Sequence, residues 1–87
     1  MIIPHRMKGG SFMPYIAIKA WPKDEETKKK VVEEINEVFL KHWGCPQEAI
    51  SISLEEYSPD EWEDKVVNTE VLAKIDKMMI LSGEKKY

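Results

Sequence analysis

Two short stretches of the chain alternate between apolar and other positions, a pattern typical of strands with one buried face. The first covers residues 15–20 and the second residues 50–55. Their apolar positions are Ile16, Ile18 and Ala20 in the first stretch and Ile50, Ile52 and Leu54 in the second. The sequence therefore predicts two strands whose apolar positions follow the same phase.

The residues between these strands have the period of an amphipathic helix. Apolar residues recur at steps of three and four, at Val31, Val32, Ile35, Val38, Phe39 and Trp43. Asp24 is placed to cap the helix, Glu25 and Glu26 suit its first turn, and Gly44 suits its end. About thirty residues between two strands are enough for a helical crossover, so we expect a right-handed β-α-β unit with parallel strands.

The C-terminal third predicts two more helices. Ser58, Pro59 and Glu61 form a helix-start signature, with a short helix expected to about residue 65. Apolar residues at helical steps predict a longer helix over 69–81, stopped by Gly83, with residues 84–87 frayed. Two parallel strands do not make a stable sheet alone, so we expect pairing with a second copy.

Composition narrows the possible partners. The chain has 87 residues and a net charge of −3, which makes it one small acidic domain and argues against nucleic-acid binding. The single cysteine, Cys45, and the isolated His5 and His42 show no metal-ligand spacing, so no metal is expected. The lone cysteine also favours a cytoplasmic protein. The longest apolar run, around residues 78–81, is too short to span a bilayer, so we expect no membrane contact.

An internal Met13-Pro14 opens the first strand and resembles a start codon. Residues 1–12 show neither the period of a helix nor that of a strand. Lys8-Gly9-Gly10 can be encoded by a purine-rich ribosome-binding sequence at suitable spacing before Met13. We therefore expect residues 1–13 to be a leader or misassigned start, and 14–87 to be the single domain. Removing Arg6 and Lys8 from the 13 basic residues leaves 11 against 16 acidic ones, a net charge of −5.

The order and spacing of these features resemble the 4-oxalocrotonate tautomerase family, in its longer bacterial subgroup. The resemblance rests on Met-Pro before an alternating strand, Asp24-Glu25-Glu26 opening a helix, the run Ile50–Glu56, and Ser58-Pro59-Asp60-Glu61-Trp62. It implies a two-layer α/β fold in which dimerisation completes a four-stranded sheet. A homodimer is expected, with a hexamer as the alternative.

The resemblance also implies a cofactor-free keto–enol tautomerase acting on a 2-oxo or 2-hydroxyenoate acid. Pro14, as a free amino terminus, would be the general base and acid. The two arginines with which family members hold dicarboxylates correspond approximately to Lys23 and Ser51, and residues 14–87 contain no arginine. This departure favours a monocarboxylate, such as an arylenolpyruvate, with Trp62 and Tyr15 supplying an apolar environment.

Each candidate residue has a structural alternative. Pro14 could simply be a strand-entry proline, because proline tolerates the first position of a strand. Lys23 and, less favourably, Lys19 could bind a carboxylate or lie in solvent. Trp62 could pack in a core or interface, and the face carrying Ser51 and Ser53 could meet substrate, solvent or another subunit. The alternative function is a non-catalytic homo-oligomeric scaffold or small-molecule binding module on the same fold.

Overall fold

The computed structural model describes residues 13–87. The chain divides into two compact units. Of the described residues, the first unit contains 13–18 together with Lys23–Glu55, and the second contains Lys19–Pro22 together with Glu56–Tyr87.

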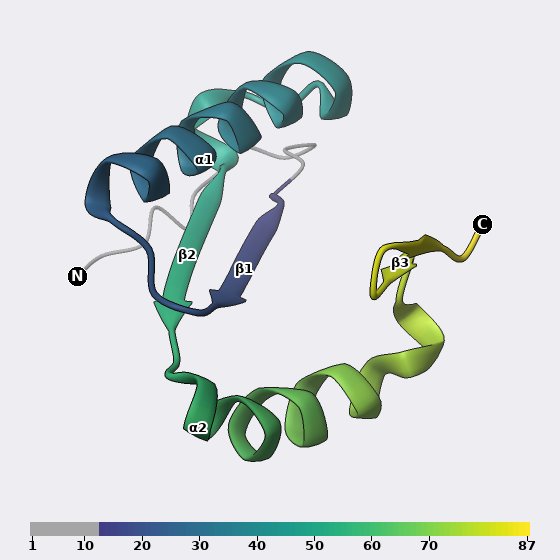
Figure 1. Ribbon diagram of the computed structural model, residues 1–87. Helices are drawn as coiled ribbons and strands as arrows, with labels where there is room; N and C mark the ends of the chain where they lie inside the picture. The colour runs from purple at the N-terminus through teal and green to yellow at the C-terminus, as the bar shows by residue number, and fades with distance from the viewer. Residues whose placement is uncertain (1–12) are drawn as a thin grey trace. The chain divides into compact units, whose positions relative to one another are not determined.

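Strands β1 (Tyr15–Ala20) and β2 (Ser51–Glu56) form a two-stranded sheet and run in the same direction (Figure 1). The Ser51 N–H donates to the Pro14 carbonyl at 3.3 Å, and the Tyr57 N–H donates to the Ala20 carbonyl at 2.9 Å. Both pairs are separated by 37 residues, and such a constant offset is the register of a parallel ladder. The first predicted strand is confirmed, and the second begins and ends one residue later than expected.

The crossover helix α1 (Glu25–Val38) begins at the predicted cap. The Asp24 carboxylate accepts the Thr27 N–H at 2.9 Å and the Thr27 hydroxyl at 2.8 Å. These bonds, the backbone one first, lower the pKa of Asp24. Val32 of α1 and Leu54 of β2 line the same open groove, of about 340 Å³, which shows that the helix packs beside β2. The predicted β-α-β unit is therefore confirmed.

The helix continues as a π-helical turn, η1 (Phe39–Trp43), and ends at Gly44. Gly44 has φ +76°, in the left-handed region, and its N–H donates to the Phe39 carbonyl at 3.1 Å. A glycine adopts this conformation without the steric cost that a Cβ imposes. A 3-10 turn, η2 (Gln47–Ala49), then leads into β2.

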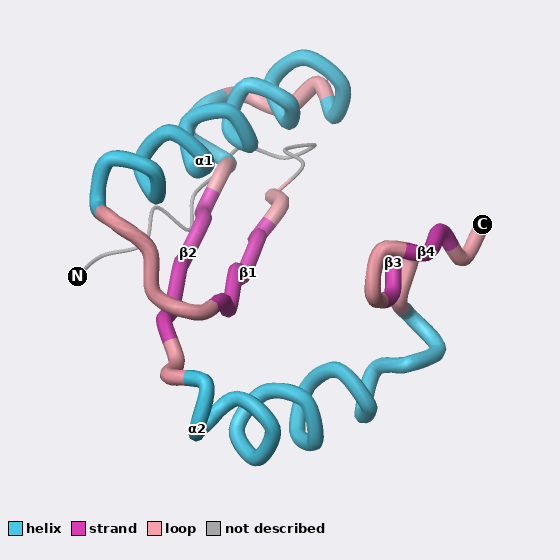
Figure 2. The backbone as a smooth tube through the Cα atoms, viewed as in Figure 1, coloured by secondary structure: helices cyan, strands magenta, loops and turns pink. Residues whose placement is uncertain are grey.

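Where two helices were predicted, the second unit contains one helical stretch that is kinked at Lys74, whose φ of −119° and ψ of 30° are not helical (Figure 2). It comprises α2 (Pro59–Trp62), the π-helical η3 (Glu63–Val71) and the 3-10 η4 (Leu72–Lys77). The predicted cap is confirmed as a capping box, in which the Ser58 N–H donates to Glu61 Oε1 at 3.3 Å. This bond, followed by the charge of Lys65, lowers the pKa of Glu61.

The predicted helix over 69–81 is wrong at both ends. The helical stretch is already formed before residue 69, and it stops at Met78, which is extended at φ −73° and ψ 125°. Strands β3 (Ile80–Leu81) and β4 (Glu84–Lys85) follow as an antiparallel hairpin, pairing Ile80 with Lys85 and Leu81 with Glu84 (Figure 2). The expectation that residues 84–87 are frayed is thus also wrong for β4.

The hairpin turn explains this error. Ser82 and Gly83 have φ values of +49° and +86°. Positive φ at both central residues is the property of the two-residue type I′ turn, whose twist suits a β-hairpin. The glycine predicted to end a helix therefore reverses a hairpin, because the same left-handed conformation serves both purposes.

Little of the described chain is shielded from water. Within residues 13–87 the buried side chains are Cys45, Ala49 and Val66. Trp43, Leu72 and Met79 are each more than half exposed. A single copy therefore leaves considerable apolar surface in contact with solvent. None of the helices in the part of the chain that is described is long and apolar enough to cross a membrane.

Candidate active site

Pro14 lies directly before β1, at the amino end of the parallel ladder. It is half-buried, and its carbonyl accepts the Ser51 backbone N–H. Proline has no N–H to contribute to a ladder, so a position at the start of a strand leaves its nitrogen outside the pairing. The structure thus brings together two predicted site residues, Pro14 and Ser51.

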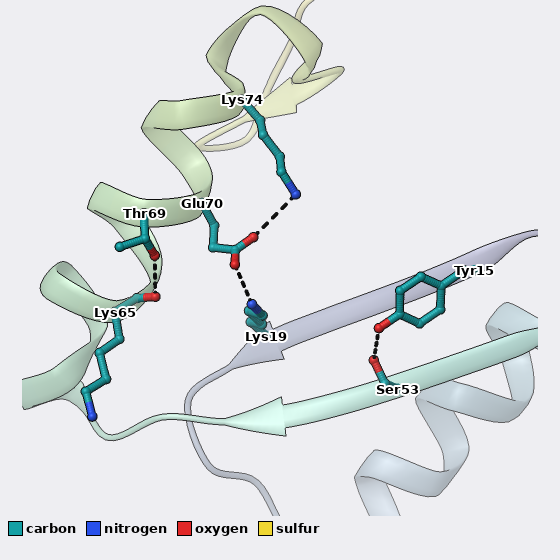
Figure 3. A network of polar contacts seen from close by, with 7 residues as sticks. All are labelled: Tyr15, Lys19, Ser53, Lys65, Thr69, Glu70 and Lys74. Atoms are coloured by element: carbon teal, nitrogen blue, oxygen red, sulfur yellow. Dashed lines mark hydrogen bonds and ion pairs between the residues drawn. The ribbon is translucent and has the colours of Figure 1, made fainter. Parts of the chain in front are cut away.

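Tyr15, the residue after Pro14, reaches across to the second strand. Its hydroxyl lies 3.2 Å from Ser53 Oγ, and the two share a hydrogen bond (Figure 3). The Tyr15 side chain is 69% exposed, and Ser53 is half-buried. Ser51 and Ser53, two residues apart on a strand, share a face of the sheet. Alternation could assign Ser53 to this face, but only the register shows that it meets Tyr15.

Lys23 does not come near Pro14 within one chain. It is an exposed residue in the loop after β1, whereas Pro14 precedes β1. A six-residue strand spans about 20 Å at its usual rise per residue. Within a single copy, therefore, β1 separates Lys23 from Pro14, and its predicted role in binding a carboxylate stays a prediction.

Lys19 is engaged elsewhere. Its Nζ lies 2.7 Å from Glu70 Oε2, and Lys74 Nζ lies 3.4 Å from the other oxygen of Glu70 (Figure 3). The hydrogen bond from Lys19, then that from Lys74, lowers the pKa of Glu70. Sequence reasoning missed Glu70, for which the only local signal was Lys74 one helical turn later.

Trp62 has two kinds of neighbour in the second unit. Its ring meets that of Trp21 edge to face, with centroids 6.5 Å apart and planes at 89°. It also lines an open groove of about 480 Å³ with Val71, Ile75 and Met78 of the helical stretch and Leu81 of the hairpin. Trp62 is thus a packing residue that also presents apolar surface to a cavity of small-molecule size.

The strand-entry Pro14 shares the first unit with the hydroxyls of Tyr15, Ser51 and Ser53. No group of three or more histidine, cysteine or acidic side chains within residues 13–87 is arranged to hold a metal ion. If its nitrogen were a free secondary amine, Pro14 could exchange a proton with a bound molecule, whereas an amide nitrogen could not.

Sequence comparison assigns this arrangement to a family. The family model described as tautomerase enzyme matches residues 14–74, most of the described chain, and the match begins at Pro14. The chain belongs to the tautomerase family. Its α/β fold is that of the family, and the family match supports a tautomerase-type activity.

Curated tautomerases from several bacteria are similar to this chain. Tautomerase PptA of Pectobacterium carotovorum is 33% identical over 66 residues, which cover 74% of this chain and 87% of that protein. Tautomerase PptA of an Enterobacter species is 29% identical over 73 residues, covering 82% and 96%. Tautomerase PptA of Escherichia coli O127:H6 is 36% identical over 53 residues, covering 59% and 71%.

Proposed function

We propose that this tautomerase catalyses cofactor-free keto–enol tautomerisation with the free amino-terminal nitrogen of Pro14 as its base. The observation that carries the proposal is that the family match begins at Pro14, the residue that also opens the sheet. In the forward step the neutral amine takes the proton of the substrate's enol hydroxyl. The resulting ammonium returns a proton to the adjacent carbon, so the proline ends each turnover as it began.

This chemistry requires the prolyl ammonium to titrate near the working pH. Burial disfavours the charged form of an amine and lowers its pKa, which is the direction that the base needs. Pro14 is half-buried in the chain that begins at Met1. A second copy or a bound substrate that covered it further would extend the same effect.

The mature chain, in this proposal, begins at Pro14 after removal of Met13. The support is that both the family match and the sheet ladder start at this residue, with β1 following at Tyr15. Any residue retained before Pro14 would make its nitrogen an amide and abolish the base. Activity should therefore require a chain whose first residue is Pro14.

We further propose that the working unit is a homodimer. The two-stranded sheet, the few buried side chains and the exposed apolar residues of the described chain support association with a second copy. Lys23 adds a geometric reason, because about 20 Å of strand separates it from the proline of its own chain. If Lys23 serves this reaction, it serves the Pro14 of another copy.

The proposed substrate is a monocarboxylate 2-hydroxyenoate with an apolar tail, such as an arylenolpyruvate. Residues 14–87 contain no arginine to hold a second carboxylate, since the bidentate fork of arginine is what suits that task. The aromatic side chain of Trp62, one of the predicted site residues, supports an apolar tail.

The test compares three proteins on phenylenolpyruvate, whose ketonisation is followed by ultraviolet absorbance. They are the chain beginning at Pro14, the same chain with Pro14→Ala, and the chain beginning at Met1. We expect activity in the first, a loss of about 100- to 10,000-fold in the second, as for other general bases, and none in the third. Pro22→Ala, at an exposed loop proline, is the matched control and should retain the activity.

Undiminished activity of Pro14→Ala would refute the mechanism. Intact mass spectrometry of the protein expressed from its native gene, with its own ribosome-binding region, tests the start. A mass beginning at Pro14 agrees with the proposal. A mass beginning at Met1 or Ile2 would leave the proline capped and would favour the non-catalytic binding module.

A further inference from the structure

The two hydroxyls beside Pro14 form a pair with hydrogen-bonding capacity to spare. Tyr15 Oη and Ser53 Oγ are 3.2 Å apart, so one of them donates its hydrogen to the other. The acceptor of that bond keeps its own O–H group free to donate elsewhere. Because the Tyr15 side chain is largely exposed, a molecule arriving from solvent can reach the pair.

The ladder fixes where this pair lies relative to the proline. Tyr15 follows Pro14 directly, and the Ser51 N–H bound to the Pro14 carbonyl sets the register that brings Ser53 to Tyr15. The prolyl nitrogen is a backbone atom at the start of β1, so it lies at the amino end of the sheet, one residue before the Tyr15 side chain.

The two lysines considered for binding a substrate carboxylate, Lys19 and Lys23, do not lie beside Pro14 in the same copy. Residues 14–87 contain no arginine. Lys19 is held by Glu70 at 2.7 Å, and Lys23 lies at the far end of β1 from Pro14. The Ser51 backbone N–H is already used by the Pro14 carbonyl.

We propose that the Tyr15–Ser53 hydroxyl pair receives the substrate's carboxylate beside Pro14, in the place that a charged side chain would otherwise take. This inference rests on the proposed function and deepens it by naming the group that selects the substrate. A paired hydroxyl polarises its partner, which strengthens the remaining donor toward an anion. The pair carries no charge, so it binds one carboxylate oxygen without the fork of an arginine.

An uncharged receptor has a consequence for specificity. Discrimination between a carboxylic acid and its neutral ester arises largely from charge, and this receptor provides no opposite charge. The enzyme should therefore turn over methyl phenylenolpyruvate within about 10-fold of the kcat/KM of the acid, since a hydrogen bond to a charged group exceeds a neutral one only modestly.

The experiment uses the chain beginning at Pro14, with the variants Tyr15→Phe, Ser53→Ala and the two combined. Tyr87→Phe is the matched control, because it removes an exposed phenol at the other end of the chain. kcat and KM are measured with phenylenolpyruvate. The affinity for 3-phenylpropionate, a carboxylate that cannot enolise in the same way, is measured by calorimetry and requires no turnover.

We expect Tyr15→Phe to raise KM and the Kd for 3-phenylpropionate by about 10- to 100-fold, the range for a lost hydrogen bond to a charged group. kcat should change far less. The Kd of the double variant should exceed that of Tyr15→Phe by less than about 3-fold, because the two hydroxyls act as one unit. Tyr87→Phe should change none of these values.

Unchanged affinity for 3-phenylpropionate in both single variants would overturn the inference, as would an acid-to-ester preference of 1,000-fold or more. Neither result would affect the role of Pro14. Conversely, activity that survives Pro14→Ala refutes the proposed function, while the binding measurement still decides whether the hydroxyl pair holds a carboxylate.

Discussion

Replacing Gly44 by alanine should destabilise the fold through backbone strain alone. Gly44 has φ +76°, and a Cβ added there would meet no other atom within 4 Å. The substitution therefore creates no clash, and it keeps the N–H that donates to the Phe39 carbonyl. What remains is the cost of the left-handed conformation for an L-residue, about 1–2 kcal/mol.

The free energy of unfolding should accordingly fall by about 1 kcal/mol or slightly more, which corresponds to a melting temperature lower by about 4–8 °C in a domain of this size. Gly44→Asn should cost less, because asparagine enters the left-handed region more readily. Urea unfolding at one fixed protomer concentration measures the change as a shift of midpoint without a change of slope.

Lys41→Ala is the matched control for this pair of variants. Lys41 is an exposed residue of η1, the same turn that Gly44 ends, and its loss should change stability by less than about 0.5 kcal/mol. If Gly44→Ala unfolded at the same urea concentration as the parent protein, the left-handed end of the helix would contribute nothing to stability, and the reasoning would be refuted.

Three further predictions follow from side-chain contacts. Val66→Ala, at a side chain only 3% exposed, should cost about 2 kcal/mol in urea unfolding, while Val31→Ala, at a 42% exposed position, should cost less than about 0.5 kcal/mol. The lowered pKa of Asp24 contributes stability that is present above its ordinary value of 3.8 and is lost as pH falls through the folded value. Asp24→Asn, which can still cap, should therefore lose less stability than the parent protein between pH 5 and about pH 3. Lys19→Met should raise the pKa of Glu70, seen by carboxyl NMR titration; an unchanged titration would contradict the ion pair.

Local patterns predicted the first half of the fold well. The Asp24 cap, the apolar spacing of α1 and the glycine at its end all act within a few residues, so they can be identified from sequence alone. The second half shows the limit of this approach. The apolar residues past residue 71 are spaced as in a helix, but the last of them, Ile80 and Leu81, lie in a hairpin. The sequence does not distinguish the two cases, because Ser82 and Gly83 can end a helix or form a type I′ turn.

The candidate site was likewise predicted only in part from the sequence. The sequence singled out Pro14 from Met13 and from the strand that follows, and it placed Ser51 and Ser53 on one face by alternation. It could not pair Tyr15 with Ser53, nor Lys19 with Glu70, because these residues lie 38 and 51 positions apart. Such contacts depend on strand register and on the course of the helical stretch.

The sequence by itself thus determined the elements of the first half, the helix caps and the candidate base, since each is specified by side-chain preferences acting over one or two turns. Only the tertiary structure decided which distant polar groups pair with one another. The parallel register pairs the Tyr15 hydroxyl with that of Ser53, Glu70 engages Lys19, and β1 separates Lys23 from Pro14 within one copy. The physical reason is that hydrogen bonds and ion pairs act over a few ångströms, and backbone pairing alone sets which distant residues come within that range.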